Sequence, residues 1–139
     1  MAGPAILEAE GLVLRRGRRT ILDRVSARFL AGSLTVVIGP NGAGKSTLIS
    51  TLAGLLKPEA GSVRLDGRPL STYASAALAR RRAYLPQNAR CEWPISVERV
   101  VALGLTPILP AFGDLTAAQR SRVADVMAQC DLGHLKDQA

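Results

Sequence analysis

The chain has 139 residues, of which 47% are hydrophobic and 21% charged, and its formal net charge is +7. This composition is typical of a single globular domain, and without a run of 18 apolar residues we expect no membrane-spanning helix. The first ten residues lack a basic start followed by an apolar stretch, so we expect no secretory signal.

The positive charge comes mainly from arginines in short groups, at 15–19 and 80–82. Two Tyr, two Phe and one Trp offer few surfaces for stacking on bases, so we predict no nucleic-acid partner. A weak attraction to anionic lipid headgroups needs only charge and is the favoured interpretation. Cys91 and Cys130 lie far apart without metal-ligand spacing and are predicted to be reduced.

The N-terminal part predicts a β-rich zone. Residues 6–14 have the pattern of a strand interrupted at Gly11, followed by a polar turn at 16–19. Apolar and polar residues alternate at 25–29, which predicts a half-buried strand that ends at Ala31 and Gly32.

The central part predicts a strand, a loop and a helix. Residues 34–38 are nearly all apolar and β-branched, which is typical of a strand covered on both faces in a parallel sheet. A helix is predicted at 45–55, before Pro58. Alternation at 63–65, with Asp-Gly at 66–67, predicts a strand and a hairpin turn.

The C-terminal part predicts mainly helices. We expect a helix at 74–81 and a short strand at 83–85 that ends at Pro86. Ser96 can cap a helix that carries Val97, Val100 and Val101. Residues 116–119 have the pattern of a capping box, and the helix after it carries an apolar stripe of Val123, Val126, Met127 and Cys130.

The loop between the central strand and helix carries the strongest functional pattern, G-x-x-x-x-G-K-[ST]. Glycines let the backbone approach phosphate oxygens, and consecutive N–H groups at 42–47 would form a concave nest for an anion. The helix start and Lys45 add positive potential, and the Ser46 hydroxyl can bind magnesium. We therefore predict that ATP and Mg²⁺ bind at Gly39, Pro40, Asn41, Gly42, Ala43, Gly44, Lys45, Ser46 and Thr47.

The sequence at 39–48 resembles the phosphate loop of ABC transporter ATPase subunits. Residues 21–26, 53–58, 61–67 and 84–87 resemble flanking segments of the same family. The resemblance implies an α/β phosphate-loop NTPase fold of ABC type. It places an antiparallel β subdomain at 1–32 and 61–70, a nucleotide-binding core at 33–58 and 83–87, and a helical subdomain at 88–139.

Two more site residues follow from the resemblance. Gln87 stands at the position of the glutamine that senses magnesium and the γ-phosphate and couples the core to the helical subdomain. Arg16 stands where the family usually has an aromatic residue that stacks on adenine. A guanidinium can lie flat on a base, and a solvated surface arginine is an equal alternative.

Other family motifs have no match in the 139 residues: the signature motif, the magnesium-binding Asp, the catalytic Glu and the switch His. His134 is interpreted as a surface residue. We expect the chain to be the N-terminal portion of an ABC ATPase domain, poorly soluble alone and inactive in hydrolysis, with Lys45 and Gln87 as the remaining catalytic-site residues.

The resemblance implies an ATP-hydrolysing transporter subunit, cytoplasmic and peripheral on the inner face of the membrane. Its partners would be transmembrane permease subunits, contacted through the helical subdomain, and a second ATPase subunit in a homodimer. Residues 80–83 and 93–104 resemble importers of iron chelates, haem or cobalamin, and zinc and manganese importers have related segments.

Two other functions stay open. A stand-alone nucleotide-binding module would bind ATP without hydrolysing it. A small-molecule kinase or GTPase is disfavoured, because neither an arginine-rich lid nor a guanine-reading Asn-Lys-x-Asp follows the loop.

Overall fold

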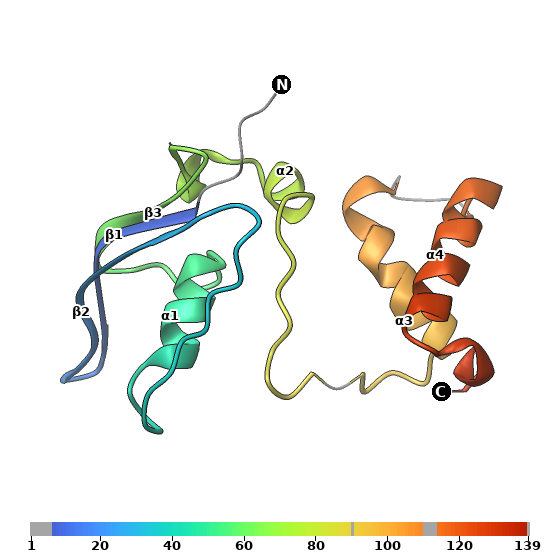
Figure 1. The fold of residues 1–139 in the computed structure, drawn as a ribbon, viewed down its shortest axis with the longest axis horizontal. Coiled ribbons are helices and arrows are strands. Elements are labelled where there is room, and N and C mark those ends of the chain that lie inside the picture. Colours follow the sequence, from blue (N-terminus) through green and yellow to red (C-terminus); the bar gives the residue numbers. More distant parts are fainter. Residues whose placement is uncertain (1–6, 90, 110–113, 139) are drawn as a thin grey trace. The chain divides into compact units, whose positions relative to one another are not determined.

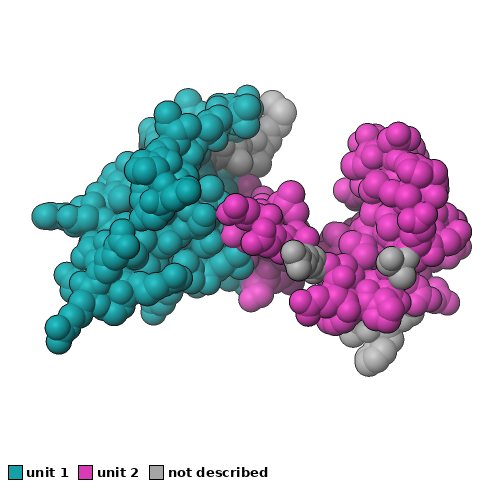
Figure 2. Space-filling model, turned by 90° about the horizontal axis from the view of Figure 1, so that it is seen from below, with its two compact units in different colours: residues 1–74 teal, residues 75–139 magenta. Residues whose placement is uncertain are grey.

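A computed structural model describes residues 7–89, 91–109 and 114–138 (Figure 1). The chain divides into two compact units, residues 1–74 and 75–139, which are coloured separately in Figure 2. Ile6, the first residue of the predicted N-terminal strand, lies outside the described residues. Among the described residues, no helix has both the length and the apolar character needed to cross a membrane.

The first unit is built on a four-stranded antiparallel sheet with the order β2-β1-β3-β4. The strands are β1 (Leu7–Arg16), β2 (Arg19–Phe29), β3 (Ala60–Leu65) and β4 (Arg68–Pro69). Each hairpin has a two-residue turn, at Gly17 and Arg18 and at Asp66 and Gly67. The alternating strands and both turns are therefore confirmed, and a short 3₁₀ turn η1 (Leu70–Thr72) follows β4.

Helix α1 (Lys45–Leu52) packs against one face of this sheet (Figure 1). Leu12 of β1 has no exposed surface, and Leu22 of β2 and Leu52 of α1 are buried with it. These side chains form the core of the unit together with Ala9 and Val63. Burial of such apolar surface is the main favourable contribution to its folding.

The helix ends at Leu52, earlier than the predicted end at Leu55. Gly54 has φ 67, and its N–H donates to the Thr51 carbonyl at 2.9 Å. The Leu55 N–H donates to the Ser50 carbonyl at 2.9 Å. These two bonds are those of a Schellman motif, which stops a helix by using its last free carbonyls.

Glu59 attaches the chain after α1 to strand β1. Its N–H donates to the Val13 carbonyl at 2.8 Å, and its carboxylate accepts from the Arg15 N–H at 3.2 Å. The far end of the loop–helix segment is thus fixed to the sheet on which the helix packs.

The strand predicted at 34–38 does not form, and this prediction was wrong. No segment in the described part of the chain pairs with these residues. Leu34 is 92% exposed and Ile38 is 86% exposed. A strand of this kind is stabilised by neighbours on both edges and by layers on both faces, and the described residues provide no neighbouring strand for it. The predicted strand–loop–helix core is therefore a loop and a helix.

The second unit contains α2 (Ser75–Ala79), α3 (Val97–Ala102), α4 (Ala117–Gln129) and two 3₁₀ turns, η2 (Leu103–Ile108) and η3 (Gly133–Leu135). Its main core consists of Leu105, Val123 and Met127. The capping box is confirmed, because the Gln119 N–H donates to the Thr116 hydroxyl at 3.2 Å and the Thr116 N–H donates to the Gln119 side chain at 2.8 Å. The Ser96 cap is confirmed as well.

Three predictions for the second unit were wrong in part or whole. Helix α2 is shorter than 74–81, and residues 83–85 form no strand because no described segment pairs with them. In the predicted stripe of α4, Val126 is 40% exposed and Cys130 is exposed. Fewer positions of this helix are therefore buried in the core than its apolar spacing predicted. His134 is exposed, as expected for a surface residue.

Candidate functional site

The loop at 39–46 contains a tight turn stabilised by its own backbone. The Ala43 N–H donates to the Pro40 carbonyl at 3.3 Å, and Gly42 has φ 80. This positive φ at the third position is what a type II turn requires, and glycine adopts it without strain. The Ala43 N–H is therefore engaged within the loop, which differs from the uninterrupted nest of N–H groups expected at 42–47.

The end of the loop lies directly against strand β2. Gly44 has φ 88, and a Cβ added to it would lie 2.9 Å from the Ile21 carbonyl oxygen. Any side chain at this position would therefore clash with backbone. The bare backbone allows the first turn of α1 to start against the sheet.

The start of α1 presents backbone N–H groups that have no acceptor among the described residues. Its hydrogen-bond ladder begins with the Leu48 N–H, which donates to the Gly44 carbonyl at 2.8 Å. The N–H groups of Lys45, Ser46 and Thr47 precede this bond, and at a helix start such groups have no acceptor within the helix. Together with the positive end of the helix dipole they suit an anion. The Ser46 side chain is exposed in this first turn.

The Lys45 ammonium lies across the beginning of its own loop. Its Nζ donates to the carbonyl oxygens of Gly39 and Pro40, each at 2.8 Å. An ammonium has three donors, so a full positive charge and a further donor remain at the loop.

One arginine at the tip of the first hairpin reaches the same loop. The Nη2 of Arg19 donates to the Gly42 carbonyl at 3.4 Å. Arg16 is paired with Arg19 across the two strands and is exposed. Arg19 is a residue of this site that the sequence did not predict, although the arginine group at 15–19 was a signal for positive potential.

Gln87 lies in a turn of the second unit and is exposed, whereas the loop belongs to the first unit. Its role at the nucleotide therefore remains a prediction. The described residues include no cluster of three His, Cys, Asp or Glu side chains that could hold a metal ion. The magnesium ligands predicted from the sequence are of another kind, the hydroxyl of Ser46 and the amide of Gln87.

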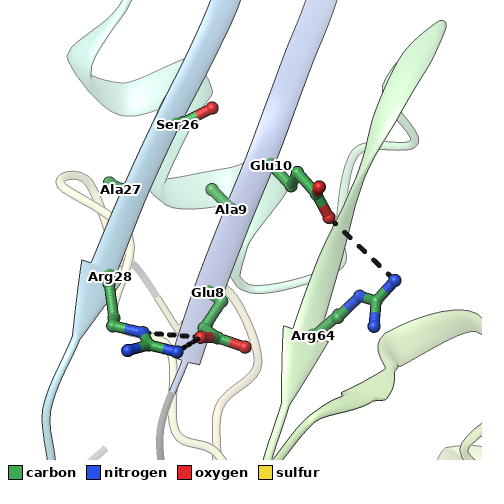
Figure 3. A pocket seen from close by; sticks show the side chains of 7 residues that line it. All are labelled: Glu8, Ala9, Glu10, Ser26, Ala27, Arg28 and Arg64. Carbon is green, nitrogen blue, oxygen red and sulfur yellow. Dashed lines mark hydrogen bonds and ion pairs between the residues drawn. The ribbon is translucent and has the colours of Figure 1, made fainter.

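A second candidate site is a hollow of about 600 Å³ on the sheet of the first unit (Figure 3). Its lining is Glu8, Ala9, Glu10, Ser26, Ala27, Arg28 and Arg64. Glu8 is paired across the strands with Arg28 and with Arg64, and Arg28 Nε donates to its carboxylate at 2.6 Å. The Oε2 of Glu10 lies 4.0 Å from the Nη2 of Arg64.

These ion pairs leave the hollow without an excess of either charge. Two carboxylates face two guanidiniums, so a charged ligand would have to displace an existing partner. The loop at 39–46, with free backbone donors and a lysine, is therefore the better candidate for ligand binding.

Known proteins resemble the chain over most of its length. The family model described as "ABC transporter" matches residues 22–139. The haemin import ATP-binding protein HmuV of Nocardia farcinica is 43% identical over an alignment of 147 residues, gaps included. The alignment covers 99% of this chain and 49% of the relative. HmuV of Streptomyces coelicolor is 41% identical, covering 94% of this chain and 46% of the relative. The chain thus spans about half the length of these relatives.

Solved structures give the same result for the fold. The ADP conformation of MJ1267, an ATP-binding cassette of an ABC transporter, superposes with a TM-score of 0.73 at 26% identity, covering 96% of this chain and 56% of that chain. The α/β phosphate-loop fold of ABC type expected from the sequence is confirmed.

Proposed function

Because this chain belongs to the ABC transporter family, we propose that its loop at 39–46 binds the phosphates of ATP. The observation that supports this most directly is the geometry of the helix start. Three backbone N–H groups at 45–47, the Lys45 ammonium and the glycine backbone at Gly44 are together at one end of α1. This is the arrangement that binds nucleotide phosphates in phosphate-loop proteins.

Lys45 is proposed to exchange its two loop carbonyls for oxygens of the β- and γ-phosphates. A phosphate oxygen carries formal negative charge, so it is a stronger partner for an ammonium than a peptide carbonyl. Residues 39–44 would shape the turn, and the N–H groups of Ser46 and Thr47 would complete the contacts. The exposed Arg16 is the proposed contact on the adenine side.

Ser46 and Gln87 are the residues proposed to hold Mg²⁺. The Ser46 hydroxyl fits the role, because it is exposed in the first turn beside the free N–H groups, and magnesium prefers hard oxygen ligands. When bound, the ion would neutralise part of the phosphate charge. The loop of this chain would supply one hydroxyl and one lysine to that charge, and the amide of Gln87 remains a prediction from the sequence.

The test is a calorimetric titration of the full chain with MgATP. Replacing Lys45 by Ala removes a charge-assisted contact, and we expect affinity to fall at least about tenfold. Lys57→Ala is the matched control, because Lys57 is an exposed lysine of the same unit outside the loop, and it should bind like the unchanged chain. Equal affinities of Lys45→Ala and Lys57→Ala for ATP would refute the assignment.

For the whole protein we propose an ATP-hydrolysing subunit that drives import across the membrane from the cytoplasmic face. Its partners would be permease subunits, contacted through the helical subdomain at 88–139, and a second ATPase subunit. The three-part division of the domain remains part of this proposal. The 139 residues contain no match to the catalytic Glu or the signature motif, so the activity proposed for them is ATP binding without turnover.

Among iron chelates, haem and cobalamin, haem is the favoured cargo, because the relatives described above carry haemin import in their names. Zinc and manganese remain the alternatives. The measurement is growth with haemin as the sole iron source after disruption of the gene. Unimpaired growth on haemin would exclude this cargo and leave the ATP-binding assignment intact.

A further inference from the structure

We propose that Arg19 is a positioning residue for the phosphate loop, which holds the peptide group between Gly42 and Ala43 in place. The proposal rests on the proposed binding of ATP phosphates at 39–46. It assigns the function of a second cation at that loop, from a different element than Lys45.

The position of Arg19 follows from the hairpin. Arg19 is the first residue of β2, directly after the two-residue turn, and it is paired with Arg16 at the end of β1. Two residues further along β2, the Ile21 carbonyl lies against Gly44. The start of β2 therefore runs beside the loop, and Arg19 reaches Gly42 from a fixed strand rather than from a mobile chain end.

The contact of Arg19 completes the fixation of one peptide group. The carbonyl of Gly42 accepts from Arg19 Nη2 at 3.4 Å, and the N–H of the same peptide, on Ala43, donates to the Pro40 carbonyl at 3.3 Å. Glycine at φ 80 imposes little resistance to rotation of this peptide. A rotated peptide would lose the Ala43 bond to Pro40 and turn the Gly42 carbonyl oxygen toward the Pro40 carbonyl, which would open the turn that shapes the loop.

Lys45 cannot provide this fixation while it binds a phosphate. Its Nζ holds the Gly39 and Pro40 carbonyls in the structure, and those two contacts are the ones that a phosphate would replace. Arg19 acts on a different carbonyl, so its contact is compatible with nucleotide binding. We infer that Arg19 maintains the turn at 40–43 when Lys45 moves to the nucleotide.

The experiment compares Arg19→Gln with Arg18→Gln in the full chain. Arg18 is the exposed residue next to Arg19 at the tip of the same hairpin, so both variants remove one positive charge from the same region and lower long-range attraction of ATP alike. By calorimetry we expect Arg19→Gln to weaken MgATP binding about three- to tenfold, the usual effect of one hydrogen bond. Arg18→Gln should stay within about twofold of the unchanged chain, and Arg19→Lys should recover part of the loss.

A spectroscopic measurement separates positioning from direct contact with the nucleotide. In the absence of nucleotide, the amide ¹H–¹⁵N resonances of Gly42 and Ala43 should shift in Arg19→Gln and stay in place in Arg18→Gln. Equal affinity losses in the two variants, or weaker binding without a shift of these resonances, would overturn the proposal. If the unchanged chain fails to bind MgATP, the proposed function fails instead, and the resonances still report on the contact of Arg19.

Discussion

The sheet of the first unit and the segment at 34–38 lie within the same unit, yet in the part of the chain that the structure describes only the sheet is held by strand pairing. Each strand of the sheet finds a partner across a two-residue turn or from β3, and its apolar side chains meet α1 in a closed core. The segment at 34–38 is apolar as well, but it pairs with no strand in the described part of the chain, and Val36 is 71% exposed. Apolar composition alone therefore does not bury a segment, because burial also requires neighbours that satisfy its backbone.

The strongest test of this difference is Leu12→Ala in β1. Leu12 is fully buried between the sheet and α1, so its truncation leaves a cavity as well as losing apolar burial. We expect the free energy of unfolding of the first unit to fall by about 3 kcal/mol. Urea denaturation followed by circular dichroism measures it, and a loss below about 1 kcal/mol would mean that this core is loosely packed.

A smaller effect is expected at the hairpin turn between β3 and β4. Gly67 has φ 73 and nothing within 4 Å of an added Cβ, so Gly67→Ala introduces backbone strain without a clash. We expect a loss of about 1 kcal/mol in the same urea experiment. An unchanged free energy of unfolding in Gly67→Ala would remove the role assigned to this turn.

The smallest effect is expected for Leu34→Ser. Leu34 is 92% exposed, and substitutions of exposed residues usually change the free energy of unfolding by less than about 0.5 kcal/mol. The urea midpoint should therefore stay in place, while sedimentation should show less self-association, because an exposed apolar segment with a free backbone favours aggregation. A fall in the free energy of unfolding comparable to that of Leu12→Ala would show that 34–38 is buried in solution.

The sequence predicted the parts of the fold whose signal lies within a few residues of the chain. Alternation at 25–29, the Asp-Gly turn and the capping box at Thr116 each depend on residues within a few positions of one another. The segments at 34–38 and 83–85 depend on pairing with distant strands, and their apolar character did not show that those partners are missing from the described residues. The end of α1 was misplaced because Gly54 stops the helix before Pro58 can.

The candidate site was predictable in its residue types and less so in its contacts. The spacing of Gly39, Gly44 and Lys45 located the loop at a helix start, where the structure has it. Spacing could not show that Lys45 would hold the loop's own carbonyls, or that Ala43 would bond to Pro40, because both contacts depend on the path of the loop backbone. The approach of Arg19 is a contact between segments 23 residues apart, which motifs do not report.

The attachment of Glu59 to β1 has a consequence for how the first unit opens. The loop–helix segment is held at its start by the contact of Gly44 with β2, and just beyond its end by the bonds of Glu59 to Val13 and Arg15. Local unfolding of α1 therefore requires breaking contacts with both strands of the β1–β2 hairpin, so loop, helix and hairpin form one cooperative opening unit. Any ligand that binds the loop would protect the whole hairpin from opening, although it contacts only one end of it.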